Sequence, residues 1–330
     1  MPDRPTILII SPALADANDG NWQTARRWSN FLARDFRVIT SRQWDAEPAA
    51  GMIALHARRS ASSIAQFSAT GRPVALVLTG TDLYRDIQVD PAAQGSLNLA
   101  SRLVVLQERG LDALPPALRS RAEVIYQSAR ALKQGSPRLR SFDLLLVGHL
   151  RNEKDPMTAL RALSHLNPMV QASFGSLRLL HIGGEKDPDT AAAFRASAGM
   201  DSRVRILGAL PHAQTRQWIR RARLLLLPSR IEGGANVLVE AVTAGVPVLA
   251  SRIPGSEGML GPDYDGYFAA GDHAGLAELI ARCQFQPEFL ERLRRQCEKR
   301  AALFEPKRER AAVRRLAHNL VPCSANTPRR

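Results

Sequence analysis

The segment LLLLPSRIEGGANVLVEAVTAG occupies residues 224–245 and decides the fold. Its apolar run 224–227 ends at a proline and indicates a buried parallel strand. Its later run 237–244 ends at a glycine and indicates a helix with a glycine stop. Between these elements lies a loop with paired glycines, and the carboxylates of Glu232 and Glu240 flank the bend. A strand, an acidic loop and a helix start therefore follow one another.

This order of elements favours a ligand with two kinds of groups. Backbone amides and the helix dipole at a helix start favour an anion. Carboxylates accept hydrogen bonds from hydroxyls. A molecule that carries both phosphate and sugar hydroxyls would satisfy both parts. The alternative interpretation is an ordinary helix start, in which Glu240 does no more than interact with the dipole.

A second loop of similar character lies earlier in the chain. The apolar run 143–147 indicates another strand, and Asp155 followed by Pro156 is typical of a helix N-cap and first helical residue. Arg151 and Lys154 therefore lie on a loop at the carboxyl end of a strand, where ligands of open α/β sheets bind. Arginine offers phosphate a planar fork and lysine a point charge. The pair predicts a diphosphate site.

The spacing Gly-x-x-Arg-x-x-Lys after a strand, followed later by Glu-Gly-Gly-x-Asn-x-x-x-Glu, resembles the nucleotide-sugar half of the glycogen-synthase-like, retaining-type glycosyltransferases. The resemblance implies the GT-B fold, an α/β fold with two doubly wound Rossmann-like domains that face a cleft. It implies that Arg151 and Lys154 clamp the diphosphate. It also implies that Glu232 contacts the donor sugar and Glu240 the ribose hydroxyls. The sugar and phosphate are expected against the backbone between them: Gly233, Gly234, Ala235 and Asn236.

Composition limits the other classes of function. The 330 residues include 45 Lys and Arg against 31 Asp and Glu, which gives a net charge of +14. Many of the arginines near the C-terminus alternate with apolar residues at helical spacing, as on a solvated helix face. No aromatic stacking series or nucleic-acid module accompanies them, so no nucleic-acid partner is expected. A basic cleft for anionic substrates explains part of the charge. A non-catalytic nucleic-acid-binding protein on the same fold is an open alternative.

Cofactor, metal and membrane sites are not expected. No Asp-x-Asp motif follows a convincing strand, so no metal is predicted, and no cofactor is expected beyond the substrates. The three cysteines are odd in number and match no zinc spacing. No apolar run reaches the length that spans a bilayer, and the first residues lack the features of a signal peptide. A cytoplasmic location without a membrane partner is the expectation.

The alternation of strands and helices restarts once along the chain. Six strands are predicted before residue 136 and five after it, and Lys133–Pro137 is typical of a linker. We therefore expect an N-terminal Rossmann-like acceptor domain over residues 1–136 and a C-terminal nucleotide-sugar domain over 137–304. By analogy with the family, residues 305–330 form a basic helix and tail that returns to the first domain.

The predicted strands of the first domain end in four polar loops, over residues 19–24, 56–60, 79–86 and 127–129. These loops carry Arg58, Arg59 and Arg85, hydroxyl groups and a glycine at a helix start, but few large aromatic side chains. Such loops suit a small anionic acceptor better than a long oligosaccharide. The alternatives are a structural histidine at position 56 and a simple turn and helix cap at residues 79–82.

These loops contain the motifs GNWxTAxRW at 20–28, ALHARRSA at 54–61 and LTGTDLYRDI at 78–87, which resemble the selenosugar synthases of selenoneine biosynthesis. The resemblance implies a hexosyl donor, UDP-N-acetylglucosamine or a related UDP-sugar such as UDP-glucose, and selenophosphate as acceptor. It implies a reaction that forms a carbon–selenium bond. His56 would contact the acceptor or act in the loss of its phosphoryl group. The expected acceptor-binding residues are Gly20, Asn21, Arg59, Thr79 and Thr81.

A conventional glycosyltransferase with a hydroxyl acceptor is the main alternative, because it would share the donor half. A selenium nucleophile is already anionic near neutral pH, so it needs a general base less than a hydroxyl does. Positioning of the nucleophile and stabilisation of the departing diphosphate would then supply the catalysis.

Overall fold

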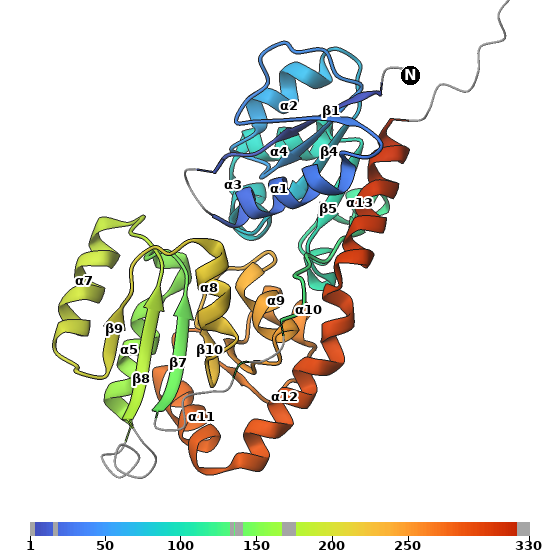
Figure 1. Cartoon of the computed structure of the whole chain (residues 1–330). Coiled ribbons are helices and arrows are strands. Elements are labelled where there is room, and N and C mark those ends of the chain that lie inside the picture. The colour runs from blue at the N-terminus through green and yellow to red at the C-terminus, as the bar shows by residue number, and fades with distance from the viewer. Residues whose placement is uncertain (1–3, 16–18, 133–134, 136–140, 167–175, 322–330) are drawn as a thin grey trace, which may run out of the picture. The chain divides into compact units, whose positions relative to one another are not determined.

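The structure, a computed structural model, describes residues 4–15, 19–132, 135, 141–166 and 176–321 and divides the chain into two compact units (Figure 1). Unit 1 contains residues 1–127 and 306–330, and unit 2 contains residues 128–305. The first boundary lies earlier than the predicted residue 136, because the chain already joins unit 2 at Ala129, whose N–H donates to the carbonyl of Phe304 at 3.2 Å. Most of the predicted linker Lys133–Pro137 lies outside the described residues.

Unit 1 is built on a parallel six-stranded sheet with the order β2-β1-β3-β4-β5-β6. The order reverses between β1 and β3, so the carboxyl ends of these neighbouring strands form the point where a ligand of a doubly wound sheet binds. The strands are β1 Thr6–Ile10, β2 Arg37–Ser41, β3 Gly51–Leu55, β4 Val74–Leu78, β5 Arg102–Val105 and β6 Ala122–Val124.

Helices cover both faces of this sheet. Alternate residues of each strand point to opposite faces, and the two apolar clusters of unit 1 separate accordingly. In one cluster, residues of α2 and α4 pack on the sheet, and in the other, residues of α1 and α13 do so. Helices α1 and α13 also contact each other (Figure 1). The helices are α1 Gly20–Leu32, α2 Ala61–Ser68, α3 Ile87–Val89, α4 Pro91–Leu99 and α13 Pro306–Leu320, with a π-helical turn η1 at Asp82–Asp86 and 3₁₀ turns η2 Glu108–Gly110 and η3 Pro116–Arg121.

Unit 2 contains a second parallel six-stranded sheet, with the order β12-β11-β10-β7-β8-β9. Counted from its first strand this is the Rossmann order 3-2-1-4-5-6, and the order reverses between β7 and β10. The strands are β7 Ser141–Val147, β8 Ser176–Ile182, β9 Val204–Ile206, β10 Leu224–Leu227, β11 Val248–Ser251 and β12 Tyr267–Phe268. Both faces of the central strands are buried, as expected for a parallel sheet between helices.

In unit 2, helices alternate with the strands. They are α5 Pro156–His165, α7 Pro188–Gly199, α8 His212–Ile219, α9 Asn236–Thr243, α10 Pro254–Leu260, α11 His273–Phe285 and α12 Pro287–Ala301, with 3₁₀ turns η4 Asn152–Lys154 and η5 Ala302–Phe304. Gly245, two residues beyond α9, has φ +72°, which explains the glycine stop. Among the described residues, no helix combines the length and apolar character needed to cross a bilayer.

The α/β fold class with two parallel sheets is confirmed. The predicted cap at Asp155 is wrong in its detail. Asp155 occupies the cap position of α5, but its backbone is left-handed (φ +43°) and its carboxylate caps no backbone N–H. The carboxylate instead accepts from the Thr158 hydroxyl at 2.9 Å and from Arg230 at 3.1 Å, because the loop turns to meet a second loop.

Candidate functional site

The carboxyl ends of β7 and β10 lie at the point where the strand order of unit 2 reverses. A small pocket opens there. It is lined by residues from both strand ends, among them Gly148, His149, Lys154, Pro228 and Ser229. The two loops that the sequence singles out, 148–155 and 228–236, therefore leave the sheet on either side of one pocket.

Lys154 and Glu232 join these two loops. The Lys154 Nζ lies 2.5 Å from Glu232 Oε1, and both side chains are largely buried. An ammonium and a carboxylate that are removed from water hold each other in place more strongly than an exposed pair does. The two residues stand 78 positions apart in the chain, so the pair is a product of the fold.

Arg230 makes two further contacts between the same loops. Its backbone N–H donates to the carbonyl of Glu153 at 2.9 Å, and its guanidinium binds the buried carboxylate of Asp155 at 3.1 Å. These contacts bind the second loop to the residues on either side of Lys154. They also explain the left-handed backbone of Asp155, which turns its carboxylate toward Arg230.

Two glycines allow the backbone around the pocket to pack closely. A Cβ atom at Gly183 would lie 1.9 Å from the carbonyl oxygen of Gly148, and one at Gly255 would lie 2.0 Å from that of Glu232. Real Cβ atoms do not approach so closely. The end of β8 therefore supports the first loop, and the start of α10 supports the second.

Arg151 follows β7 and α9 follows the loop after β10, so both come after the carboxyl ends of neighbouring strands. Arg151 is half-buried in extended backbone, and its Nε has no hydrogen-bond partner among the described residues. α9 begins at Asn236, and the residue at its cap position, Ala235, has no side chain that could accept a capping hydrogen bond. A buried guanidinium donor without a partner among the described residues, and a helix start whose cap residue is alanine, are both suited to an anion.

Glu240 has a partner that sequence reasoning missed. His212, the first residue of α8, lies with its Nε2 2.5 Å from Glu240 Oε1 in α9. The carboxylate is about one-tenth exposed and the imidazole about one-third. Nothing in the sequence singles out His212, because this histidine lies in none of the motifs described above.

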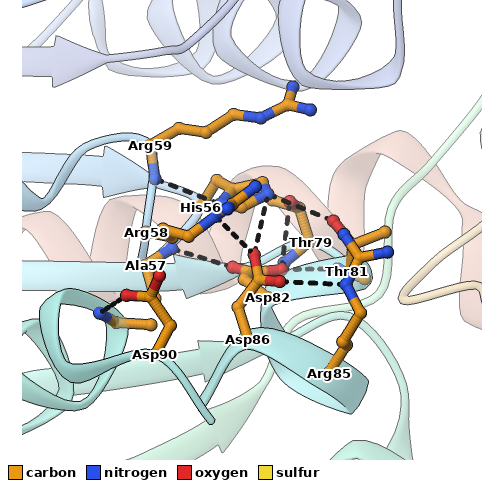
Figure 2. Close-up of polar contacts among 12 residues, drawn as sticks. His56, Ala57, Arg58, Arg59, Thr79, Thr81, Asp82, Arg85, Asp86 and Asp90 are labelled. Carbon is orange, nitrogen blue, oxygen red and sulfur yellow. Dashed lines mark hydrogen bonds and ion pairs between the residues drawn. The ribbon is translucent and has the colours of Figure 1, made fainter.

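In unit 1 the turn after β3 and the turn after β4 are bound to each other (Figure 2). The fully buried carboxylate of Asp82 accepts from the backbone N–H groups of Ala57, Thr79 and Gly80, at 2.8–2.9 Å. His56 is buried, with its Nε2 3.2 Å from Thr81 Oγ1. The predicted residues His56, Thr79 and Thr81 therefore lie within one hydrogen-bonded cluster.

In the same cluster, Asp86 forms ion pairs with two arginines (Figure 2). Its buried carboxylate lies 3.1 Å from Arg58 Nε and 3.1 Å from Arg85 Nε, and both guanidinium groups are nearly half-exposed. Arg59 is exposed and donates its backbone N–H to His56 Nδ1 at 3.4 Å. Burial lowers the pKa of His56, and Arg59 and Arg58 act in the same direction, against Asp82 and Asp86.

Gly20 and Asn21 begin α1, which follows the strand next to β3. The helix start already has a cap, since Asp19 accepts from the N–H of Trp22 at 3.0 Å. One turn further along α1, the buried Thr24 hydroxyl accepts from Gln127 Nε2 at 2.5 Å. This hydrogen bond connects α1 to the segment that follows β6. Neighbouring strands thus bring three of the four predicted loops to the carboxyl ends of the same sheet, and the hydrogen bond of Gln127 brings the fourth beside α1.

Among the described residues, no group of three or more His, Cys, Asp and Glu could hold a metal ion.

Comparison with known proteins assigns the family. Residues 129–302 match the family of Glycosyl transferases group 1. The chain belongs to this family. The matched stretch includes both loops of the unit 2 pocket, with Arg151, Lys154, Glu232 and Glu240.

Relatives and solved structures agree with this assignment. This group 1 glycosyltransferase is 30% identical over 170 residues to D-inositol 3-phosphate glycosyltransferase 1 of Catenulispora acidiphila, which covers 50% of this chain and 41% of the relative. It is 28% identical over 160 residues to the D-inositol 3-phosphate glycosyltransferase of Thermobifida fusca, covering 46% of this chain and 36% of the relative. The chain thus matches less than half of the length of these curated relatives.

The fold is shared over nearly the whole chain with Anabaena HepE in complex with UDP and glucose, at a TM-score of 0.71 and 15% identity, covering 96% of this chain and 100% of that one. It is also shared with the sucrose-phosphate synthase of Thermosynechococcus elongatus, at a TM-score of 0.73 and 17% identity, covering 96% and 99%. These likenesses show the GT-B fold of this group 1 glycosyltransferase.

Proposed function

We propose that this glycosyltransferase transfers a hexosyl group from a UDP-sugar, UDP-N-acetylglucosamine or UDP-glucose, to selenophosphate. The observation that carries the donor half is the pair of Lys154 and Glu232 at the reversal point of the unit 2 sheet. The named complexes of HepE with UDP and glucose support a uridine nucleotide on this fold. The acceptor half rests on the cationic loops of unit 1 and on their resemblance to selenosugar synthases.

In the donor site, the departing diphosphate is neutralised by the cations of the first loop. Arg151 offers an unused guanidinium donor, and Lys154 is held at the pocket wall by Glu232. The backbone of Gly233, Gly234, Ala235 and Asn236 receives the sugar and phosphate at the start of α9. Glu232 positions the hexose, and Glu240 accepts hydrogen bonds from the ribose hydroxyls.

The reaction forms one bond and breaks one at the anomeric carbon. The selenium lone pair of selenophosphate bonds to that carbon, and the carbon–oxygen bond to the diphosphate breaks as UDP leaves with the electron pair. Water then cleaves the selenium–phosphorus bond, which yields inorganic phosphate and a 1-selenosugar. Arg151 and Lys154 supply the charge that the leaving group needs, so we expect turnover to persist in EDTA.

The acceptor site is assigned to the turns after β3 and β4, with Gly20 and Asn21 at the start of α1. Arg58 and Arg85 are fixed on Asp86, and Arg59 stands exposed beside them. Cations that are held in place and partly exposed, together with nearby hydroxyls, suit a small polyanion. Selenophosphate attacks through an anionic selenium, so no base has to remove a proton from the attacking atom.

The test is incubation of the full chain with UDP-N-acetylglucosamine or UDP-glucose and selenophosphate. We expect UDP release together with a selenium-bearing hexose, identified by its selenium isotope pattern in mass spectrometry. UDP release with a hydroxyl acceptor, and none with selenophosphate, would overturn the assignment. A chain that binds no UDP by calorimetry would overturn the donor site as well.

A cyclitol phosphate is the second candidate acceptor. The curated relatives are named D-inositol 3-phosphate glycosyltransferases, and such an acceptor also carries a phosphate that Arg58 or Arg85 could bind. The same assay with inositol 3-phosphate distinguishes the two, because the product then contains a glycosidic oxygen and no selenium.

A further inference from the structure

The turn that carries His56 has a backbone that its side chain does not favour. His56 has φ +73°, in the left-handed region that residues with a Cβ rarely adopt. A conformation of this kind persists only where the surroundings enforce it, and such residues concentrate at functional sites. The surroundings here are the hydrogen bonds of Asp82, one of which holds the N–H of Ala57, the next residue.

The ring of His56 is in one tautomer. A backbone N–H can only donate, so the N–H of Arg59 makes His56 Nδ1 an acceptor, at 3.4 Å. A neutral imidazole whose Nδ1 accepts carries its proton on Nε2. The neutral form is also the one that burial favours, since burial lowers the pKa of His56.

The Nε2 proton has a single hydrogen-bonding partner among the described residues. Thr81 Oγ1 lies 3.2 Å away, whereas the carboxylate of Asp86 lies 3.9 Å away, beyond hydrogen-bonding distance. Thr81 Oγ1 therefore accepts from His56. Its own hydrogen points elsewhere, and the structure gives it no acceptor among the described residues.

We infer that His56 is a positioning residue that fixes the half-buried Thr81 hydroxyl as a hydrogen-bond donor to the anionic acceptor, and that Asp82 holds His56 in this orientation. The order of donation runs from Arg59 N–H to His56, from His56 to Thr81, and from Thr81 to the bound anion. His56 then exchanges no proton in either step of the reaction. This assignment rests on the proposed function only in placing the acceptor beside Thr81.

The tautomer can be tested without any substrate. In the full chain labelled with ¹⁵N-histidine, the His56 signals are those that disappear in His56→Asn. We expect them to show a protonated Nε2 and an unprotonated Nδ1 at neutral pH, and Asp82→Asn to alter them. A protonated Nδ1, or a charged ring at neutral pH, would overturn the inference whatever the substrate is.

The catalytic consequence is tested with matched variants of His56. His56→Gln keeps an N–H that reaches Thr81, whereas His56→Asn tolerates the left-handed backbone and can accept from Arg59 but is too short to reach Thr81. We expect the first to retain kcat/KM for selenophosphate within about tenfold and the second to lose about 10²-fold, the scale of one lost donor to an anion. Equal losses in both variants, together with the disappearance of an ionisation from the pH profile, would show His56 to be an acid or base instead.

Thr81 gives the complementary pair. Thr81→Ser keeps the hydroxyl and is expected to behave like the wild type. Thr81→Val keeps the shape but removes the donor itself, so it is expected to raise KM for selenophosphate about 10²-fold, at least as large a loss as in His56→Asn. An unchanged KM in Thr81→Val would contradict the inference. If the wild type uses no selenophosphate at all, the proposed function fails, and the nitrogen signals still decide the tautomer.

Discussion

At the scale of single residues, the candidate site of unit 2 contains two pairs of side chains that hold each other before a ligand arrives. Lys154 is bound to Glu232, and Glu240 is bound to His212. A side chain held in place loses less conformational freedom when a ligand binds than a free one does. The proposed donor contacts are therefore preorganised.

Lys154→Ala should lower kcat for UDP release by roughly 10²–10³, because the cation acts on charge that develops as the diphosphate departs. Lys154→Arg keeps the charge and should lose less. The measurement is steady-state UDP release with a saturating UDP-sugar. Wild-type kinetics in Lys154→Ala would remove this residue from the chemistry.

His212→Ala should raise KM for the UDP-sugar roughly fivefold and leave kcat unchanged, because about 1 kcal/mol of hydrogen bonding that orients Glu240 is lost equally in the ground and transition states. His165→Ala is the matched control, since His165 lies at the C-terminal end of α5, whereas the loop of the candidate site precedes the first residue of that helix. A change in kcat with KM unaltered would place His212 in the chemical step instead.

At the scale of elements, the strands were predictable because parallel strands buried on both faces read as apolar runs. The start and end of β10 match the predicted Leu224–Leu227. β12 was missed, since its two residues form no pattern. The left-handed backbone of His56 and the pair of His212 and Glu240 were not predictable either, because each is set by residues far away in the chain.

Gly255 in α10 and Gly95 in α4 are both helical, yet alanine should act on them in opposite directions. A Cβ at Gly255 would collide with the Glu232 carbonyl, so Gly255→Ala should displace the acidic loop and weaken UDP-sugar binding at least tenfold. A Cβ at Gly95 meets nothing within 4 Å, so Gly95→Ala should stabilise unit 1 by about 0.5–1 kcal/mol. Calorimetric binding and thermal melting measure the two effects. Equal behaviour of the variants would refute the steric argument.

At the scale of the whole molecule, each unit has its own sheet and its own buried apolar residues. Helix α13 belongs to the first unit. The sequence indicated two α/β domains because the alternation of strands and helices restarts. The position of the first boundary was harder to predict, since it depends on contacts such as that of Ala129 with Phe304 rather than on linker composition.

One buried carboxylate adds polar contacts to the apolar packing of α13 on unit 1. Glu309 accepts from Trp28 Nε1 and from Arg27 Nε, each at 2.7 Å, and its side chain is fully buried. Glu309→Ala would leave the indole N–H and the guanidinium without this acceptor, so we expect unit 1 to lose about 3–5 kcal/mol, as when one partner of a buried pair is removed. Arg314→Ala, which removes a more exposed ion pair with Asp35 on the same helix, should cost about 1 kcal/mol or less. Urea unfolding followed by tryptophan fluorescence reports mainly on unit 1, which contains Trp22, Trp28 and Trp44, whereas unit 2 contains Trp218. Trp28 is buried beside Glu309. Comparable midpoints for the two variants would show that α13 is held by its apolar face alone.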